Sequence, residues 1–178
     1  MAKSSIASPT DVVDFLTAQH EQIKSLFVKT LSASGESREN AFVDLRRLLA
    51  VHETVEERKI ANGAAVVDAR LSEEHEAKKV LQQLEKLDVD STEFTDKLTE
   101  LRDAVLDHAE HEEHDEFKRL GEQLSSEELE NMGRAAELAE AIAPTRPHAG
   151  VESQLANLVA GPFAAMLDRA RDAIIGKG

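Results

Sequence analysis

Histidine and carboxylate residues gather in one stretch of the sequence, residues 108–117, which reads HAEHEEHDEF. Three histidines and five acidic residues fall within these ten positions. Imidazole nitrogens and carboxylate oxygens together bind iron, manganese or zinc, but a run of this composition is also typical of a solvated helix face. The position of each side chain relative to the buried face of its helix decides between the two interpretations.

The helical pattern places several of these side chains on buried faces. Apolar residues recur every three or four positions, which predicts helices. In the second predicted helix, His52 and Glu56 take apolar-stripe positions one turn apart, and His108 and Glu112 do the same in the fourth. Because a carboxylate is rarely buried without a partner, these glutamates favour metal binding. The first helix carries a histidine in its own stripe, which is Val13, Leu16, His20, Ile23, Phe27 and Leu31.

The same arrangement of ligand types occurs twice along the chain. His20 precedes His52 by 32 residues, and His75 precedes His108 by 33, with a glutamate four residues after each second histidine. Two helical hairpins of this pattern bring four imidazoles and two carboxylates into the centre of a bundle. On a straight helix His75 lies off the apolar stripe. It can therefore be a ligand only if the first turn of the helix bends or lies at the mouth of the bundle. The set suits two metal ions, with iron the first choice and manganese the second, and ligand type alone leaves zinc open.

Further polar side chains border these predicted ligands. Glu53, His111 and Glu116 are expected either to support the ligands or to serve as alternative ligands. His111 flanks the inward face. Together with Glu116, five residues later, it forms an alternative pair of metal ligands. Glu113 is interpreted as a surface or supporting carboxylate, and His114 as a solvated residue.

The composition excludes several classes of protein. Without cysteine in 178 residues, the chain has no disulfide, thiolate metal site or thiol nucleophile. A net charge of -14 disfavours contact with a phosphate backbone, and the absence of tyrosine and tryptophan removes aromatic platforms for bases. No apolar stretch is long enough to span a membrane, and the N-terminal residues do not form a signal sequence. We therefore expect a cytoplasmic protein that binds neither nucleic acid nor membrane.

The predicted fold is all-α, an up-down-up-down four-helix bundle with additional C-terminal helices. Its helices are expected from residues 8–11 to about 31, over 38–60, from 73 to about 87 and over 93–120, with a first connection over 32–37. Short links between long helices make neighbours antiparallel. The bundle spans residues 8–121. A capping box, Ser125 to Glu128, opens an additional helix within 122–143. A proline-containing linker follows over 144–151, and the amphipathic helical segment 152–178 is expected to pack on the bundle, on a second copy or on another partner.

The motifs AQHEQI, HETVEE, EEHEAKK and DHAEHEE resemble those of the hemerythrin-like family, the HHE cation-binding four-helix bundles. The resemblance covers about residues 11–120. Oxygen-carrying members have a second histidine where this chain has Lys79, four residues after His75, so the chain is similar to the bacterial branch written H, HxxxE, H, HxxxE. The resemblance implies six di-iron ligands: His20, His52, Glu56, His75, His108 and Glu112.

The resemblance further implies a non-haem di-iron protein that reacts with small molecules. No histidine has a glutamate three residues before it, which argues against a ferritin-type site and favours two iron ions joined by an oxo or hydroxo bridge. We expect catalase-like disproportionation of hydrogen peroxide, linked to oxidative stress and iron homeostasis, with ferroxidase activity as a further option. No catalytic residue is expected beyond the metal ligands. The alternative is binding or sensing of O2, NO or iron without turnover, reported through the C-terminal segment. A metal-free scaffold is the third interpretation.

Overall fold

Helices form the whole regular structure of the described residues, so the predicted all-α fold is confirmed. The computed structural model describes residues 10–61, 77 and 79–142. The predicted linker 144–151 and the segment 152–178 lie outside this range. A short helical segment covers residues 79–84. The other elements are α1 (Val12–Ser32), α2 (Gly35–Ala61), α4 (Thr92–His111), the π-helix η1 (Glu112–Glu116), α5 (Phe117–Gln123) and α6 (Ser126–Ile142).

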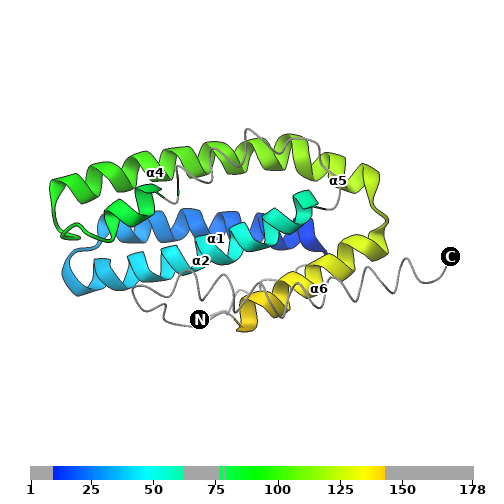
Figure 1. The fold of residues 1–178 in the computed structure, drawn as a ribbon, viewed down its shortest axis with the longest axis horizontal. Coiled ribbons are helices and arrows are strands. Elements are labelled where there is room, and N and C mark those ends of the chain that lie inside the picture. The colour runs from blue at the N-terminus through cyan, green and yellow to red at the C-terminus, as the bar shows by residue number, and fades with distance from the viewer. Residues whose placement is uncertain (1–9, 62–76, 78, 143–178) are drawn as a thin grey trace, which may run out of the picture.

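The long helices lie side by side in a bundle (Figure 1). Helices α1 and α2 run antiparallel, α4 runs in the direction of α2, and η1 and α5 extend the line of α4. Helix α6 turns back and packs against α1 and α2 on the side opposite α4. None of the described helices combines the length and the apolar composition of a membrane-spanning segment. The cytoplasmic location stays a prediction.

The ends of α1 and α2 differ slightly from the sequence prediction. Asp11 caps α1, because its carboxylate accepts hydrogen bonds from the backbone N–H groups of Val13 and Asp14. The connection to α2 is shorter than the predicted 32–37, since α2 begins at Gly35. Gly35 has a φ of +54°, a conformation that glycine adopts without strain, and its N–H donates to the Asp90 carboxylate.

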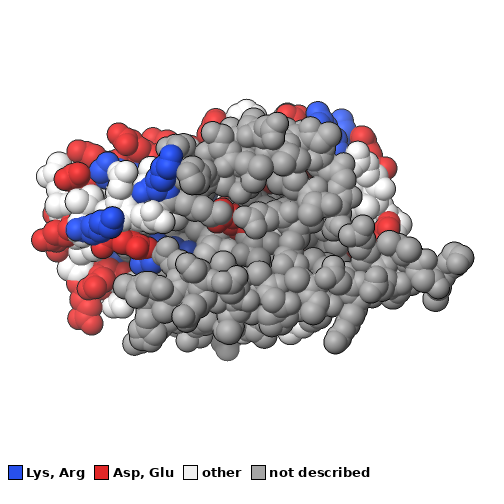
Figure 2. All heavy atoms as spheres, viewed as in Figure 1, with Lys and Arg blue, Asp and Glu red and all other residues white. Residues whose placement is uncertain are grey.

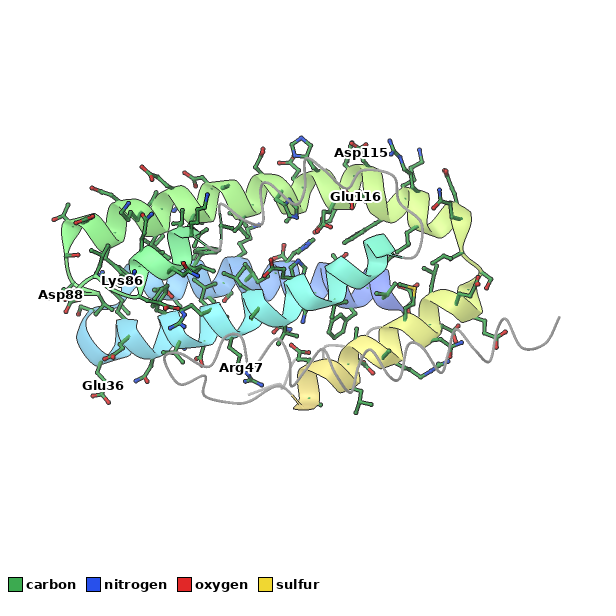
Figure 3. All side chains as sticks on the ribbon, in the orientation of Figure 1. Glu36, Arg47, Lys86, Asp88, Asp115 and Glu116 are labelled. Atoms are coloured by element: carbon green, nitrogen blue, oxygen red, sulfur yellow. The ribbon has the colours of Figure 1, made fainter. Side chains whose placement is uncertain are left out.

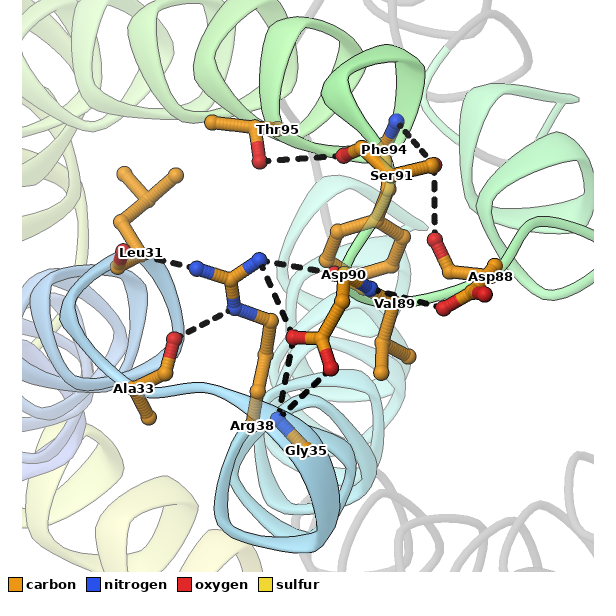
Figure 4. A network of polar contacts seen from close by, with 10 residues as sticks. All are labelled: Leu31, Ala33, Gly35, Arg38, Asp88, Val89, Asp90, Ser91, Phe94 and Thr95. Atoms are coloured by element: carbon orange, nitrogen blue, oxygen red, sulfur yellow. Dashed lines mark hydrogen bonds and ion pairs between the residues drawn. The ribbon is translucent and has the colours of Figure 1, made fainter.

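Arg38 joins the two connections at this end of the bundle (Figure 4). Its guanidinium donates to the carbonyl oxygens of Ala33 at 2.6 Å, Leu31 at 3.3 Å and Val89 at 2.8 Å. It also lies 3.6 Å from the Asp90 carboxylate. One largely buried side chain therefore holds the α1–α2 connection against the link that precedes α4.

Within the described part of the chain, buried apolar residues form two clusters, one toward each end of the bundle. The larger core cluster consists of Ile23, Phe27, Phe42, Leu45, Leu48, Leu84, Phe94, Leu98 and Leu101. The smaller core cluster consists of Val12, Phe15, Leu16, Val55, Phe117, Leu129 and Ala136. Residues of α6 belong to the smaller cluster, so this helix covers the end of the bundle where α1 begins.

Helix α6 is capped and docked by specific contacts. The predicted capping box is present: Ser125 donates from its backbone N–H and its hydroxyl to the Glu128 carboxylate, at 2.8 and 2.7 Å, and the Glu128 N–H donates back to the hydroxyl at 3.4 Å. Buried Gly133 lies against the start of α1. A Cβ atom at this position would come within 2.6 Å of the Asp11 carbonyl carbon. The absence of a side chain thus allows the two backbones to approach this closely.

Candidate metal centre

A layer of buried polar side chains separates the two apolar clusters. On α1, His20 lies between Leu16 of the smaller cluster and Ile23 of the larger one. On α2, His52 lies between Leu48 and Val55 in the same way. Helical spacing of three and four residues turns each histidine toward the interior. The sequence pattern therefore places polar groups at the middle of a continuous buried stripe.

Three ligand atoms from three elements converge in this layer. The Nε2 atoms of His20 and His52 lie 3.1 Å apart, and His20 Nε2 lies 3.4 Å from Glu112 Oε2. Glu112 is only 2% exposed, and both histidines are buried as well. One ligand atom from each of these three residues lies within 4.8 Å of the other two. This group could hold a metal ion.

Neighbouring acceptors determine which nitrogen of each ring carries the proton. The Glu113 carboxylate lies 2.7 Å from His20 Nδ1, and the Gln19 carbonyl oxygen lies 2.9 Å from His52 Nδ1. Both partners accept hydrogen bonds, so each Nδ1 is the donor. The Nε2 atom of each ring faces the other ring, and His20 Nε2 also faces Glu112.

Two Nε2 atoms and a carboxylate oxygen at these distances are suitably placed to bind a cation between them. Metal–nitrogen bonds of about 2.1 Å at a right angle place two ligand atoms about 3.0 Å apart. The observed 3.1 and 3.4 Å distances are close to that value. Two histidines and one carboxylate with open positions are typical ligands of non-haem iron. The residues present fit a metal ion.

The fourth long helix is not the continuous α-helix that the sequence predicted. A π-helical turn, η1, separates α4 from α5, and the Phe117 N–H donates to the carbonyl of Glu112, five residues earlier. Residues five apart in an α-helix are turned about 140° from each other. The wider π turn instead lets both Glu112 and Phe117 be buried. The Phe117 ring stacks on His20, with 5.8 Å between centroids and 8° between planes.

The other predicted ligands of this helix lie at the edge of the layer or outside it. His108 Nε2 lies 3.9 Å from Glu112 Oε2, and this histidine is 20% exposed. His111 does not flank the inward face as predicted, because 60% of its side chain is exposed and its Nδ1 bonds the Asp107 carbonyl. His114 is exposed, as expected. Figure 3 shows Asp115 on the outer side of the helix and half-buried Glu116 toward the bundle.

Part of the predicted six-ligand set is not described. His75 lies outside the described residues, and Glu56 belongs to α2 but its side chain is likewise outside the description. Glu53 is half-buried on α2. The structure brings His20, His52 and Glu112 together and leaves His108 nearby. The complete ligand set stays a prediction.

Two residues that contact the centre, Gln19 and Phe117, were not recognised from the sequence, and for a third, Glu113, a supporting role was only one of two interpretations. Gln19 is 1% exposed and follows the apolar spacing Val12, Leu16, Gln19, Ile23, which was a usable signal. Glu113 was interpreted mainly as a surface carboxylate, yet it contacts His20 while remaining 44% exposed. Phe117 lies on the inward face only because of the π turn. No helical periodicity in the sequence could have placed Phe117 there.

Two buried histidines and a buried carboxylate inside a bundle of helices are typical of helical metal-binding proteins. The chain belongs to the hemerythrin HHE cation binding domain family, whose model matches residues 11–120. A curated relative from Nostoc sp. (strain PCC 7120), described as a DNA nickase, is 24% identical over 127 residues, which are 67% of this chain. The chain spans only 36% of that relative's length. No solved structure gives a significant match.

Proposed function

We propose that the chain is a non-haem di-iron protein that disproportionates hydrogen peroxide. The observation that carries the proposal is the convergence of the Nε2 atoms of His20 and His52 with the buried Glu112 carboxylate. We assign these three residues to one ion. His75, His108 and Glu56 are proposed to complete the site for the second ion. Manganese is the second choice of metal.

Bound iron would supply Lewis acidity and cycling between two oxidation states. In the overall reaction two peroxide molecules yield two of water and one of O2, because one is reduced by two electrons and the other loses two. The protein residues hold the geometry: Glu113 and Gln19 keep protons at Nδ1 of their histidines. Phe117 covers one face of the His20 ring and excludes water there.

Binding or sensing of O2, NO or iron without turnover is the second candidate function. The contact of α6 with the bundle beside the centre favours this function, because an additional helix could change its packing when the metal centre binds a ligand. Nickase activity is not carried over from the Nostoc relative. The net charge of -14 opposes binding to DNA, and on the described part of the face in Figure 2 acidic side chains are interspersed with basic ones.

The proposal is tested on full-length protein produced with added iron. Metal content is measured by elemental analysis, and O2 release on addition of peroxide is followed in the same sample with an oxygen electrode. Glu112→Gln removes a proposed ligand, whereas the matched control Glu110→Gln changes an exposed glutamate of α4. We expect two irons per chain and sustained O2 release in the wild type and in the control, and loss of both in the Glu112 variant.

The other outcomes separate the candidate functions. Two irons per chain without O2 release would reject peroxide turnover and favour binding or sensing. Wild-type protein without a bound transition metal would reject the metal centre. Equal metal content in the Glu112 variant and the wild type would reject this ligand assignment.

A further inference from the structure

Helix α6 is connected to the metal centre by a chain of hydrogen bonds. The amide nitrogen of Gln19 donates to the Glu140 carboxylate at 3.4 Å, and the amide oxygen of the same residue accepts from His52 Nδ1 at 2.9 Å. Glu140 lies near the end of α6, twenty residues beyond the last residue that the family model matches. The connection therefore comes from outside the family domain.

The Glu140 carboxylate determines which groups donate and which accept in this series of hydrogen bonds. A carboxylate only accepts hydrogen bonds, so Glu140 turns the NH2 group of the Gln19 amide toward itself. The carbonyl oxygen of the amide must then face His52, which keeps the proton on Nδ1 and the lone pair on Nε2. The opposite amide orientation would place its oxygen against the Glu140 oxygen. Because Gln19 is only 1% exposed, water is poorly placed to supply the missing partner.

The packing of α6 holds Glu140 in position. Leu129 and Ala136 belong to the smaller core cluster, and Gly133 lies against the start of α1. These residues are spaced by four and three, and Glu140 follows Ala136 by four, so all lie on the face that docks against the bundle. Glu137 of the same helix is exposed to solvent.

We propose that Glu140 is a positioning residue of the metal centre, acting on His52 through Gln19. The proposal rests on the metal centre proposed above and adds to it a residue outside the family domain. Loss of such a supporting group weakens metal binding by about tenfold or more when it contacts the ligand directly. We expect that loss for Gln19→Leu and a smaller one, about threefold, for Glu140→Ala.

The test uses Co²⁺ as the probe, added to metal-free full-length protein. Its affinity is measured by competition with a chelator, and its visible absorption reports the geometry of its ligands. Glu140→Ala is expected to weaken binding about threefold and to alter the spectrum, whereas Glu140→Gln, which keeps an acceptor oxygen, restores both. The control Glu137→Ala removes an equal charge from the exposed face of α6 and leaves both measurements unchanged.

A double-variant cycle distinguishes positioning from a general loss of α6 packing. If Glu140 acts through Gln19, Glu140→Ala has no further effect on Co²⁺ binding in the Gln19→Leu background. An undiminished effect in that background would overturn the proposal, as would wild-type affinity and spectrum in the single Glu140→Ala variant. Wild-type protein that binds no Co²⁺ would overturn the metal centre, and this inference with it.

Discussion

Glu112 and Phe117 lie five residues apart and are both buried, and a hydrogen bond from the Phe117 N–H to the Glu112 carbonyl joins them across one π-helical turn. The turn places a carboxylate and an aromatic ring on the same side of the helix, around the imidazole of His20. Single π turns inside helices occur frequently at functional sites. Here the turn positions both Glu112, a proposed ligand, and Phe117, whose ring covers the proposed ligand His20.

Phe117→Ala should destabilise the protein by about 3–5 kcal/mol, because it opens a cavity between His20 and the smaller core cluster. Urea denaturation of the metal-free protein measures this loss. Phe117→Leu, which keeps most of the volume, should cost less than half as much. Equal losses for the two variants would contradict a packing role for the ring.

Gly133→Ala and Gly121→Ala should change stability in opposite directions. At Gly133 the added Cβ meets backbone atoms of Asp11 and Val12 within 2.6–2.9 Å, so α6 must shift, at a cost of about 1–3 kcal/mol. At Gly121, in α5, nothing lies within 4 Å of the added atom. Alanine should therefore stabilise that helix by about 0.5–1 kcal/mol. Thermal denaturation of both variants checks the pair, and a stabilised Gly133 variant would contradict the close approach of α6 to α1.

Arg38→Met should lower the unfolding free energy by about 2–3 kcal/mol. The variant leaves carbonyl oxygens of Leu31, Ala33 and Val89 without their charged donor. Arg102→Met is the control, because Arg102 contacts only a neighbouring exposed aspartate among the interactions described for it. That change should stay within about 0.5 kcal/mol. Urea midpoints compare the two variants, and a similar small effect at both positions would refute the role of Arg38.

The capping box of α6 should contribute stability that depends on pH. Hydrogen bonds from the Ser125 hydroxyl and backbone hold the pKa of the Glu128 carboxyl below its usual value. A lowered folded-state pKa gives stability that is present above the usual glutamate pKa and is lost as pH falls through the folded value. The urea midpoint of wild type should therefore exceed that of Glu128→Gln at pH 7, and the gap should narrow at pH 3. A gap that is unchanged at pH 3 would contradict this contribution.

Metal removal should lower stability, because ligand groups held in the folded bundle are dispersed in the unfolded chain. At free Fe²⁺ one hundred times its dissociation constant, the folded state gains about 2.7 kcal/mol relative to protein with chelator. Anaerobic thermal denaturation with and without Fe²⁺ measures the gain. Glu112→Gln should show no such shift, and a shift equal to that of the wild type would contradict the role of Glu112.

Local patterns in the sequence predicted the described long helices and most of their inward-facing residues. Helical periodicity is a local property, so the stripe through His20 and the apolar positions around His52 could be identified from their spacing. The capping box at Ser125 was equally local. Element ends were predicted less accurately, since α2 begins at Gly35 through a contact with Asp90, which is distant in sequence.

The assembly of the centre, in contrast, depends on how the helices pack in three dimensions. The π turn changes the inward face within one helix, and the sequence pattern predicted a regular helix there. The contact of Glu113 with His20 and the orientation of the Gln19 amide between Glu140 and His52 join residues up to 121 positions apart. Such contacts depend on how four packed helices, α1, α2, η1 and α6, approach one another. Periodicity along a single helix carries no information about that approach, which is why these supporting residues emerged only from the folded chain.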